Sequence, residues 1–358
     1  MSSKTELIPF PHRRLAVIDT KFPWKLSGFR YWENREIHSQ RPDTLYFATH
    51  PYHDTFPTTV YPFSEFQQIA ISHGITDVYC VFLNLTLSLL GLCSLPDGSH
   101  MPGSNLGWNI RAFLEDRKIK LHSTLYPGGG LDPGTSIEFL NYAAMHCSTV
   151  FTNIDEVLGA IPSSLYYPVV INTDLFAYSP KHATLPIEVT FCAFNYPRKG
   201  FPLLIQAFNM LPEDFHLNIV GDWQDHLHLL TNGNYTFHGL LEPESLRSIY
   251  LRTHVFVNCS TQDQFALDGF PTTAAVDAMS TGCILVSTNP RNDKLVLQSG
   301  VDYIEVASDA QTITNTLLWI KANLKDALKI GTRGAETISE RFDVKNIVLS
   351  KLKHMMGY

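Results

Sequence analysis

The sequence predicts an α/β protein made of two doubly wound, parallel-sheet domains. Its 358 residues exceed what one hydrophobic core usually organises. Short apolar runs of strand length alternate with longer amphipathic stretches, a pattern typical of a parallel sheet covered by helices. This alternation occurs twice, on either side of the proline-containing segment 176–186, which lacks a helical period. We therefore predict domains at residues 1–176 and 177–340.

The apolar runs and amphipathic stretches predict the following elements in chain order. In the first half, strands are expected at 15–19, 44–48, 77–83, 119–123 and 149–152, with helices near 29–39, 64–73, 106–116 and 136–145. In the second half, strands are expected at 188–193, 216–220, 255–258, 284–287 and 303–306, with helices near 202–211, 242–251, 272–281 and 310–324. A long helical pattern from 324 to 356 closes the chain, with an interruption at 341–343.

Composition narrows the classes of function. With 27 Lys and Arg against 34 Asp and Glu, the net charge is −7, which argues against a nucleic-acid partner. The longest apolar run, 78–95, is broken by polar residues and does not predict a membrane span. The first 14 residues do not resemble a secretory signal, and the six cysteines form no CxxC pair. We expect a reduced, cytoplasmic protein.

The segment 268–283, DGFPTTAAVDAMSTGC, is the most informative. A Gly-Phe-Pro turn followed by two threonines predicts a helix whose first amides can bind an anion, such as a diphosphate. One acid precedes the turn and a second lies inside the helix, and carboxylates accept hydrogen bonds from vicinal hydroxyls. The alternative is a turn followed by an N-capped core helix. The candidate residues are Asp268, Gly269, Phe270, Pro271, Thr272, Thr273 and Asp277.

A pair of basic residues, Arg198 and Lys199, follows the strand predicted at 188–193 and precedes an amphipathic stretch. This order places two cations at the carboxyl end of a strand, where doubly wound sheets bind ligands. There they can neutralise the charge that develops on a departing diphosphate. Two solvated basic residues at a turn are the alternative.

In the order of its motifs, residues 167–342 resemble glycosyltransferase family 4, the retaining nucleotide-sugar transferases of GT-B architecture. The motifs that carry the resemblance are Lys199-Gly200, Ile219-Val220-Gly221-Asp222, Phe237-His238-Gly239, the run from Val255 to Ser260, Asp277-Ala278-Met279-Ser280-Thr281-Gly282-Cys283 and Glu340-Arg341-Phe342. The resemblance implies donor contacts at Gly221, Asp222 and Ser260, besides the candidates above. It also implies two facing domains and a C-terminal helix, 341–358, that packs on the first domain.

Two positions depart from the family pattern. Family members usually carry two glutamates with seven residues between them, whereas here Asp277 replaces the second, and Asp268 precedes it with eight between. Either Asp268 is shifted by one residue, or the amides of Gly269 and Phe270 replace the first glutamate. The family's arginine before the lysine is absent from the matching stretch 193–195, and Arg198 is its expected substitute.

The first half contributes two candidates. Gly28 follows the first strand and its loop and opens a helix, and the resemblance implies contact with the donor phosphates or sugar; a turn glycine that caps a helix is the alternative. His122 is read at the end of the strand 119–123, close to where the family has a histidine beside the reacting sugar. A neutral imidazole there can hold a sugar hydroxyl. A hydrogen-bonded structural histidine is the alternative.

The resemblance implies a metal-independent hexosyltransferase, of the kind used in polysaccharide biosynthesis, with His122, Asp268 and Lys199 at the reaction. The donor is a nucleoside-diphosphate sugar, UDP or GDP being expected, and the acceptor a glycan or lipid-linked glycan. No cofactor is expected. A nucleotide-sugar epimerase and a GT-B protein that binds ligands without catalysis remain alternatives. A glycosyl phosphorylase would need a cofactor lysine or a dedicated phosphate site, which the sequence does not reveal. Peripheral association with the inner face of the membrane, the oligomeric state, and the identities of the donor base, sugar and acceptor stay open.

Overall fold

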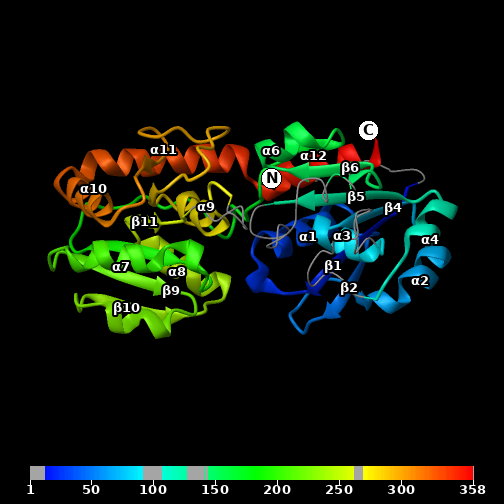
Figure 1. The fold of residues 1–358 in the computed structure, drawn as a ribbon, viewed down its shortest axis with the longest axis horizontal. Coiled ribbons are helices and arrows are strands. Elements are labelled where there is room, and N and C mark those ends of the chain that lie inside the picture. The colour runs from blue at the N-terminus through cyan, green and yellow to red at the C-terminus, as the bar shows by residue number, and fades with distance from the viewer. Residues whose placement is uncertain (1–12, 92–106, 127–140, 142–143, 262–268, 358) are drawn as a thin grey trace, which may run out of the picture. The chain divides into compact units, whose positions relative to one another are not determined.

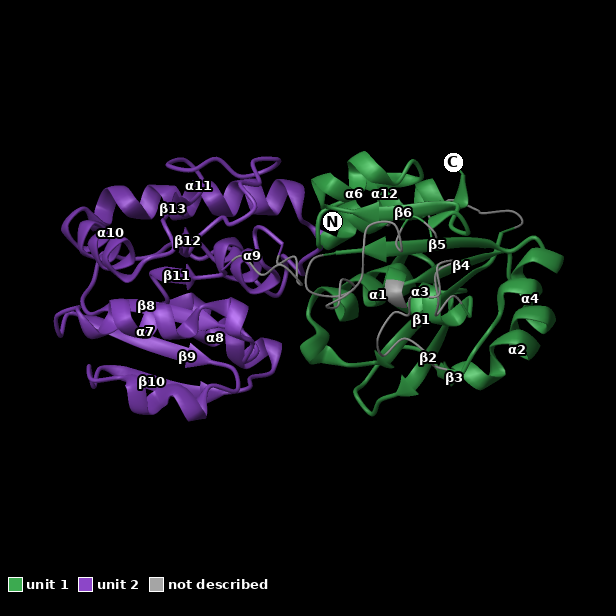
Figure 2. Cartoon of the chain, viewed as in Figure 1, with its two compact units in different colours: residues 1–169, 344–358 green, residues 170–343 purple. Residues whose placement is uncertain are grey.

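The chain forms two compact units in the computed structural model, which describes residues 13–91, 107–126, 141, 144–261 and 269–357 (Figure 2). Unit 1 comprises residues 1–169 and 344–358, and unit 2 comprises residues 170–343. The boundary predicted after residue 176 lies inside unit 2. Its segment is bound there, because Ser280 Oγ donates to the carbonyl of Phe176 (2.7 Å) and Lys181 Nζ donates to that of Tyr250 (2.6 Å).

Unit 1 contains a seven-stranded sheet whose paired strands are all parallel (Figure 1). Its order is β3 (Val60–Pro62), β2 (Leu45–Pro51), β1 (Leu15–Phe22), β4 (Asp77–Cys80), β5 (Lys120–Leu125), β6 (Thr149–Thr152) and β7 (Ser164–Tyr166). The order reverses between β1 and β4, where Ile18 lies opposite Cys80. Ligands of doubly wound sheets bind at the carboxyl ends of the strands beside such a reversal.

The described helices of unit 1 are α1 (Phe29–Gln40), α2 (Phe66–His73), α3 (Leu83–Leu89), α4 (Arg111–Asp116), α6 (Asp155–Ala160) and α12 (Val344–Met356). The strand expected at 77–83 is shorter, since β4 ends at Cys80 and α3 begins at Leu83. A continuous apolar run fits a buried strand and a buried helix equally well. Most of the helix expected at 136–145 lies outside the described residues.

The last helix, α12, packs against α1 within unit 1. The contact is partly ionic: Lys351 Nζ of α12 lies 2.6 Å from Glu33 Oε1 of α1, and each side chain is 1% exposed. Tyr167 also bonds to Ser350 of α12, hydroxyl to hydroxyl, at 2.8 Å. The chain therefore ends in the unit in which it begins.

Unit 2 contains a six-stranded sheet, also parallel throughout. Its order is β10 (Tyr235–Gly239), β9 (Phe215–Val220), β8 (Ile187–Cys192), β11 (Val255–Asn258), β12 (Ile284–Ser287) and β13 (Ile304–Glu305). Its described α-helices are α7 (Phe201–Asn209), α8 (Pro243–Arg252), α9 (Thr273–Ser280), α10 (Ala310–Ala322) and α11 (Leu324–Arg341). The order reverses between β8 and β11. Because crossovers are right-handed, α7 and α9 lie on opposite faces of the sheet.

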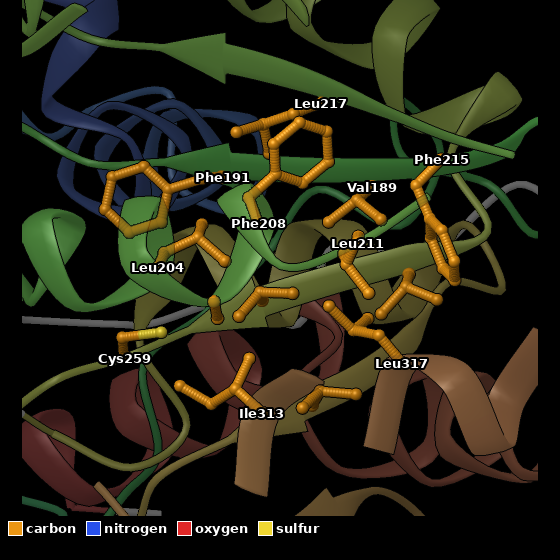
Figure 3. Packing of buried hydrophobic residues seen from close by; sticks show 14 of the residues in the cluster. Val189, Phe191, Leu204, Phe208, Leu211, Phe215, Leu217, Cys259, Ile313 and Leu317 are labelled. Carbon is orange, nitrogen blue, oxygen red and sulfur yellow. The ribbon is translucent and has the colours of Figure 1, made fainter. Parts of the chain in front are cut away.

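An apolar core lies between the sheet of unit 2 and the helices α7 and α10 (Figure 3). The amphipathic helix α7 buries Leu204 and Phe208, α10 adds Ile313 and Leu317, and β8 contributes Phe191. Each such side chain contributes about 1.5–3 kcal/mol when it is fully buried. No described helix is long and apolar enough to cross a membrane.

Candidate functional site

Two loops meet at the carboxyl edge of the sheet of unit 2, where the strand order reverses. The loop after β8 holds a short 3-10 turn, Pro197–Lys199, and the loop after β11 holds Ser260 and Thr261. The amide of Thr261 donates to the carbonyl of Arg198 at 2.8 Å. This contact brings Arg198 and Lys199 to the strand reversal, the place where such sheets bind their ligands.

Two glycines allow this edge to close tightly. Gly200 has a φ of 68°, and a Cβ placed on it would lie 2.0 Å from the carbonyl oxygen of Cys259. Gly221, with a φ of 126°, would bring a Cβ to 2.0 Å from the carbonyl oxygen of Ala193. Any larger residue would push these loops apart. Both glycines therefore shape the edge through the backbone.

The other predicted residues of these loops make bonds within the protein. The carboxylate of Asp222 accepts a hydrogen bond from the amide of Asn195 at 2.7 Å, and Asn195 Nδ2 donates to the carbonyl of Asp222 at 3.1 Å. Ser260 is buried, and its hydroxyl donates to Asn258 Oδ1 at 3.0 Å. Asp222 and Ser260 thus stabilise the loops beside the basic pair, Arg198 and Lys199.

The side chain of Arg198 is also oriented by a neighbour. Its guanidinium carbon lies 4.7 Å from the centroid of the Tyr196 ring, the distance of a cation–π contact. Such a contact leaves the edge of the guanidinium plane able to donate hydrogen bonds. Tyr196 and Asn195 were not among the sequence candidates, although both lie within four residues of Lys199.

The helix α9 begins at Thr273, after the Gly-Phe-Pro turn. The side chain of Thr272 makes no capping hydrogen bond, and the first amides of a helix lack partners within the helix. Phe270 is buried and its ring packs on that of Tyr303, 4.9 Å between centroids. This packing anchors the turn beside the amino end of α9. Asp268 lies outside the described residues.

Asp277, in the second turn of α9, is 9% exposed. No described residue donates a hydrogen bond to its side chain, and burial raises the pKa of this carboxyl well above its ordinary value. It is close enough to Cys192, at the end of β8, and to Tyr250 of α8 to interact electrostatically with both. A carboxyl that receives no hydrogen bond from the described residues can accept hydrogen bonds from a ligand.

Gly28 lies at the carboxyl end of β1 in unit 1, between a 3-10 turn and α1. Its φ of 62° and ψ of −118° form a conformation that glycine adopts far more readily than other residues. The backbone of Gly28 therefore needs glycine, whether or not a ligand approaches it.

His122 is placed differently from the sequence expectation. The strand β5 runs on to Leu125, so His122 does not end it but lies in its first half. The ring is 2% exposed, and Nε2 lies 3.3 Å from Oδ1 of Asp77, the first residue of β4. Asp77 also binds the guanidinium of Arg13. This network lies toward the amino ends of the strands, opposite to the ligand-binding edge, where the bonds of His122 fit the alternative of a structural histidine. Its catalytic role stays a prediction.

Within unit 2, the structure brings most of the donor-site candidates to one edge of the sheet, and sequence reasoning missed the side chains that support them. Cys192, Asn195, Tyr196 and Tyr250 are these additions. Cys192 ends β8 directly, and its position at a strand end was the one available signal. The candidates described in unit 2 are Arg198, Lys199, Gly221, Asp222, Ser260, Gly269, Phe270, Pro271, Thr272, Thr273 and Asp277.

Residues 186–323, which lie within unit 2, match the family model of glycosyl transferases group 1. No curated protein matches the sequence.

Solved structures resemble the chain over nearly its whole length. HepE from Anabaena, in complex with UDP and glucose, is 16% identical, with 97% of this chain and 100% of that chain covered and a TM-score of 0.72. Sucrose-phosphate synthase from Thermosynechococcus elongatus is 13% identical, with 96% of this chain and 98% of that chain covered and a TM-score of 0.70. A glycosyltransferase from Rickettsia africae is 12% identical, with 96% of this chain and 99% of that chain covered and a TM-score of 0.67. The fold is GT-B. The predicted fold class of two Rossmann-like domains is thereby confirmed.

Proposed function

We propose that the protein transfers a sugar from a nucleoside-diphosphate sugar to a hydroxyl acceptor. The observation that carries the proposal is Asp277, a buried carboxyl without a described protein donor on the helix that follows the Gly-Phe-Pro turn. Vicinal hydroxyls of a ribose supply the donors that this carboxyl lacks. The match of residues 186–323 to the glycosyl transferase model supports the same reading.

The diphosphate is held, in this proposal, by the cations Arg198 and Lys199 and by the first amides of α9, Thr272 and Thr273 being nearest to its start. Cations and a helix amino terminus together stabilise the negative charge on the departing diphosphate. They supply countercharge without a divalent ion, which is why we propose a metal-independent reaction. UDP is the first nucleotide to test, because the Anabaena protein was solved with it.

The proposed reaction retains the configuration of the sugar. The bond between C1 and the leaving phosphate oxygen breaks as the acceptor oxygen approaches C1 on the same face, and that phosphate oxygen takes the acceptor proton. The enzyme then needs no base of its own, and none is assigned. Asp268 is the proposed contact to the donor sugar, with the amides of Gly269 and Phe270 as its substitute. Gly28 is the proposed contribution of unit 1. We also propose a cytoplasmic location and a glycan or lipid-linked glycan acceptor.

The first experiment is a calorimetric titration of the whole chain with UDP, GDP, ADP and CMP, with and without chelator. We expect one of the nucleoside diphosphates to bind selectively, with the same affinity in the presence and in the absence of chelator. Lys199→Ala is expected to weaken this binding about tenfold or more, because it removes one charge-assisted hydrogen bond. Asp277→Asn is also expected to weaken it, because it replaces one acceptor oxygen with a donor. Lys325→Ala, which removes an exposed lysine of α11, serves as the matched control and should bind normally.

The outcomes separate the competing functions. Failure to bind any of the nucleotides would contradict the proposal and favour a GT-B protein that binds other ligands. Binding followed by conversion of the donor sugar into its epimer, without any acceptor, would favour the epimerase. Binding followed by transfer to water or to an offered glycan supports the transferase.

A further inference from the structure

Lys21 occupies a place in unit 1 that the proposed donor site does not use. It is the last residue but one of β1, and it pairs with His50 of β2, so it lies at the carboxyl edge of the sheet. Its Nζ lies 4.2 Å from the ring centroid of Trp24 and 4.1 Å from that of Tyr52. Two cation–π contacts therefore fix the position of a single ammonium group.

Backbone and side-chain bonds hold the two rings in place. The amide of Lys25, next to Trp24, donates to the carboxylate of Asp54 at 2.8 Å. Three residues beyond Tyr52, the carbonyl of Thr55 accepts from the hydroxyl of Tyr31 in α1 at 2.9 Å. The two loops that follow β1 and β2 are thus tied to each other and to α1, and Lys21 is positioned before any ligand binds.

The ammonium of Lys21 has no ion-pair partner in the described part of the chain. Ring faces stabilise a cation without neutralising it, and they do not use up its three hydrogen-bond donors. The neighbouring acid, Asp54, accepts the amide of Lys25 instead, and His50 and His53 beside it are exposed. This edge therefore presents a positioned ammonium group that has no ion-pair partner among the described residues.

We infer that Lys21 binds an anionic group carried by the acceptor. The inference rests on the proposed function, which assigns the donor to unit 2 except for a contact at Gly28. The rest of the ligand-binding edge of unit 1 is thereby left to the acceptor. The shared chemistry is an oxyanion on a sugar, either a phosphate or the carboxylate of a uronic acid. Aromatic rings beside a cation suit such a ligand, because the apolar face of a sugar ring packs on them while its anion meets the ammonium.

The test uses calorimetry on the whole chain with saturating UDP, so that the proposed diphosphate site is occupied before the probe is added. The probes are glucose 1-phosphate, glucuronate and neutral glucose. We expect a charged probe to bind at least about tenfold more tightly than glucose, as a charge-assisted contact requires. Tighter binding of glucose 1-phosphate assigns the phosphate as the ligand group, and tighter binding of glucuronate assigns the carboxylate.

Variants connect this binding to Lys21. Lys21→Gln should lose the preference for the charged probe, while Lys21→Arg, which keeps the cation, should retain most of it. Lys120→Gln is the matched control, because Lys120 is an exposed lysine at the opposite, amino-terminal edge of the same sheet. The circular dichroism spectrum of each variant checks that it is folded.

The inference is overturned if UDP binds but no charged probe binds better than glucose. It is also overturned if Lys21→Gln melts at a lower temperature yet binds the charged probe as the unaltered protein does, since Lys21 would then have a structural role alone. Failure of UDP to bind is a different outcome, which contradicts the proposed function and removes the acceptor role of Lys21 with it.

Discussion

The two units differ in how their buried charged side chains are paired. Unit 1 buries cations with their partners: Arg30 with Asp19 at 3.0 Å, and Lys351 with Glu33 at 2.6 Å. The ammonium of Lys351 also lies within 6 Å of four ring centroids, those of Tyr79, Tyr126, Phe151 and Tyr167. In unit 2, none of the described lysines and arginines is buried.

Two buried carboxyls of unit 2, those of Asp302 and Asp277, differ in the hydrogen bonds that they accept. Asp302 accepts from the amide of Gln298 at 2.9 Å and from Thr337 Oγ1 at 2.8 Å. Asp277 receives no hydrogen bond from any residue that the structure describes. The comparison of Asp302 with Asp277 suggests how a structural charge differs from a ligand-binding one. A buried charge that stabilises the fold has its partner within the protein.

Lys351→Met is expected to have the largest effect. It leaves Glu33 buried and without its cation, which should lower the free energy of unfolding by about 3–5 kcal/mol. Urea unfolding followed by circular dichroism, fitted with one transition per unit, measures the loss. The double variant Glu33→Gln with Lys351→Met removes both charges and keeps an acceptor for the hydroxyl of Tyr79, so it should recover most of the stability. A single variant within about 1 kcal/mol of the parent would mean that the pair is not buried as described.

Gly200→Ala comes next and tests the backbone packing of unit 2. Gly239 has a similar φ, 65° against 68°, but its added Cβ would meet nothing within 4 Å, whereas that of residue 200 would meet a carbonyl oxygen. Gly239→Ala therefore measures the conformational cost alone, about 1–2 kcal/mol. Gly200→Ala should cost about 1–3 kcal/mol more, because the loop must move. Equal losses in urea unfolding would show that the close approach to Cys259 is not rigid.

Asp277→Asn should stabilise unit 2 at neutral and alkaline pH while weakening nucleotide binding. Burial raises the pKa of this carboxyl, so the folded protein binds the proton more tightly than the unfolded chain does. The free energy of unfolding therefore decreases as the pH rises from about 3.9, the pKa in the unfolded chain, through the pKa in the folded protein. Asparagine removes that loss, so the difference between variant and parent should grow from pH 4 to pH 8 in urea unfolding. A difference that does not change with pH would contradict the raised pKa.

Asp302→Asn is the matched comparison for Asp277→Asn. Both bonds that reach the carboxylate of Asp302 are donated by neutral groups, one to each oxygen. Asparagine retains a single acceptor oxygen, so this variant should unfold at a lower urea concentration than the parent at pH 8. The two substitutions are chemically identical, and opposite signs of effect would separate the ligand-binding carboxyl from the structural one.

His122→Gln is expected to have the smallest effect, and a pH-dependent one. Burial lowers the pKa of His122, which keeps the ring neutral in the folded protein, so stability is lost as pH falls from about 6.5 through the folded pKa. Burial acts to raise the pKa of Asp77, but hydrogen bonds from His122, Arg13 and Thr76 lower it overall, so its own loss comes below about pH 3.9.

Glutamine can donate to Asp77 as His122 does, but it does not titrate. Thermal unfolding of His122→Gln should therefore change less between pH 7.5 and pH 5 than that of the parent. UDP affinity should be unaltered, since His122 lies toward the amino ends of the strands. A loss of nucleotide binding in this variant would support a role for His122 in the site.

The buried strands were predictable because their sequences are continuous apolar runs. The bounds of β6, β11 and β12 agree with the predicted ranges 149–152, 255–258 and 284–287. The strands β3, β7 and β10 were missed, and each lies at an edge of its sheet. Edge strands are half-exposed, and their short mixed sequences carry little periodic signal. The break between α11 and α12 was also predicted, at 341–343.

The sequence by itself determined the class of the fold and the composition of the candidate donor site. Alternating apolar and amphipathic segments specify parallel sheets, and local order places Arg198, Lys199 and Asp277 after strands or inside one helix. The tertiary structure alone decided which charges have partners. Glu33 and Lys351 are 318 residues apart, and His122 meets Asp77 across 45. Such pairs form only when the strand order and the return of α12 bring them together, and no local pattern in the chain records that.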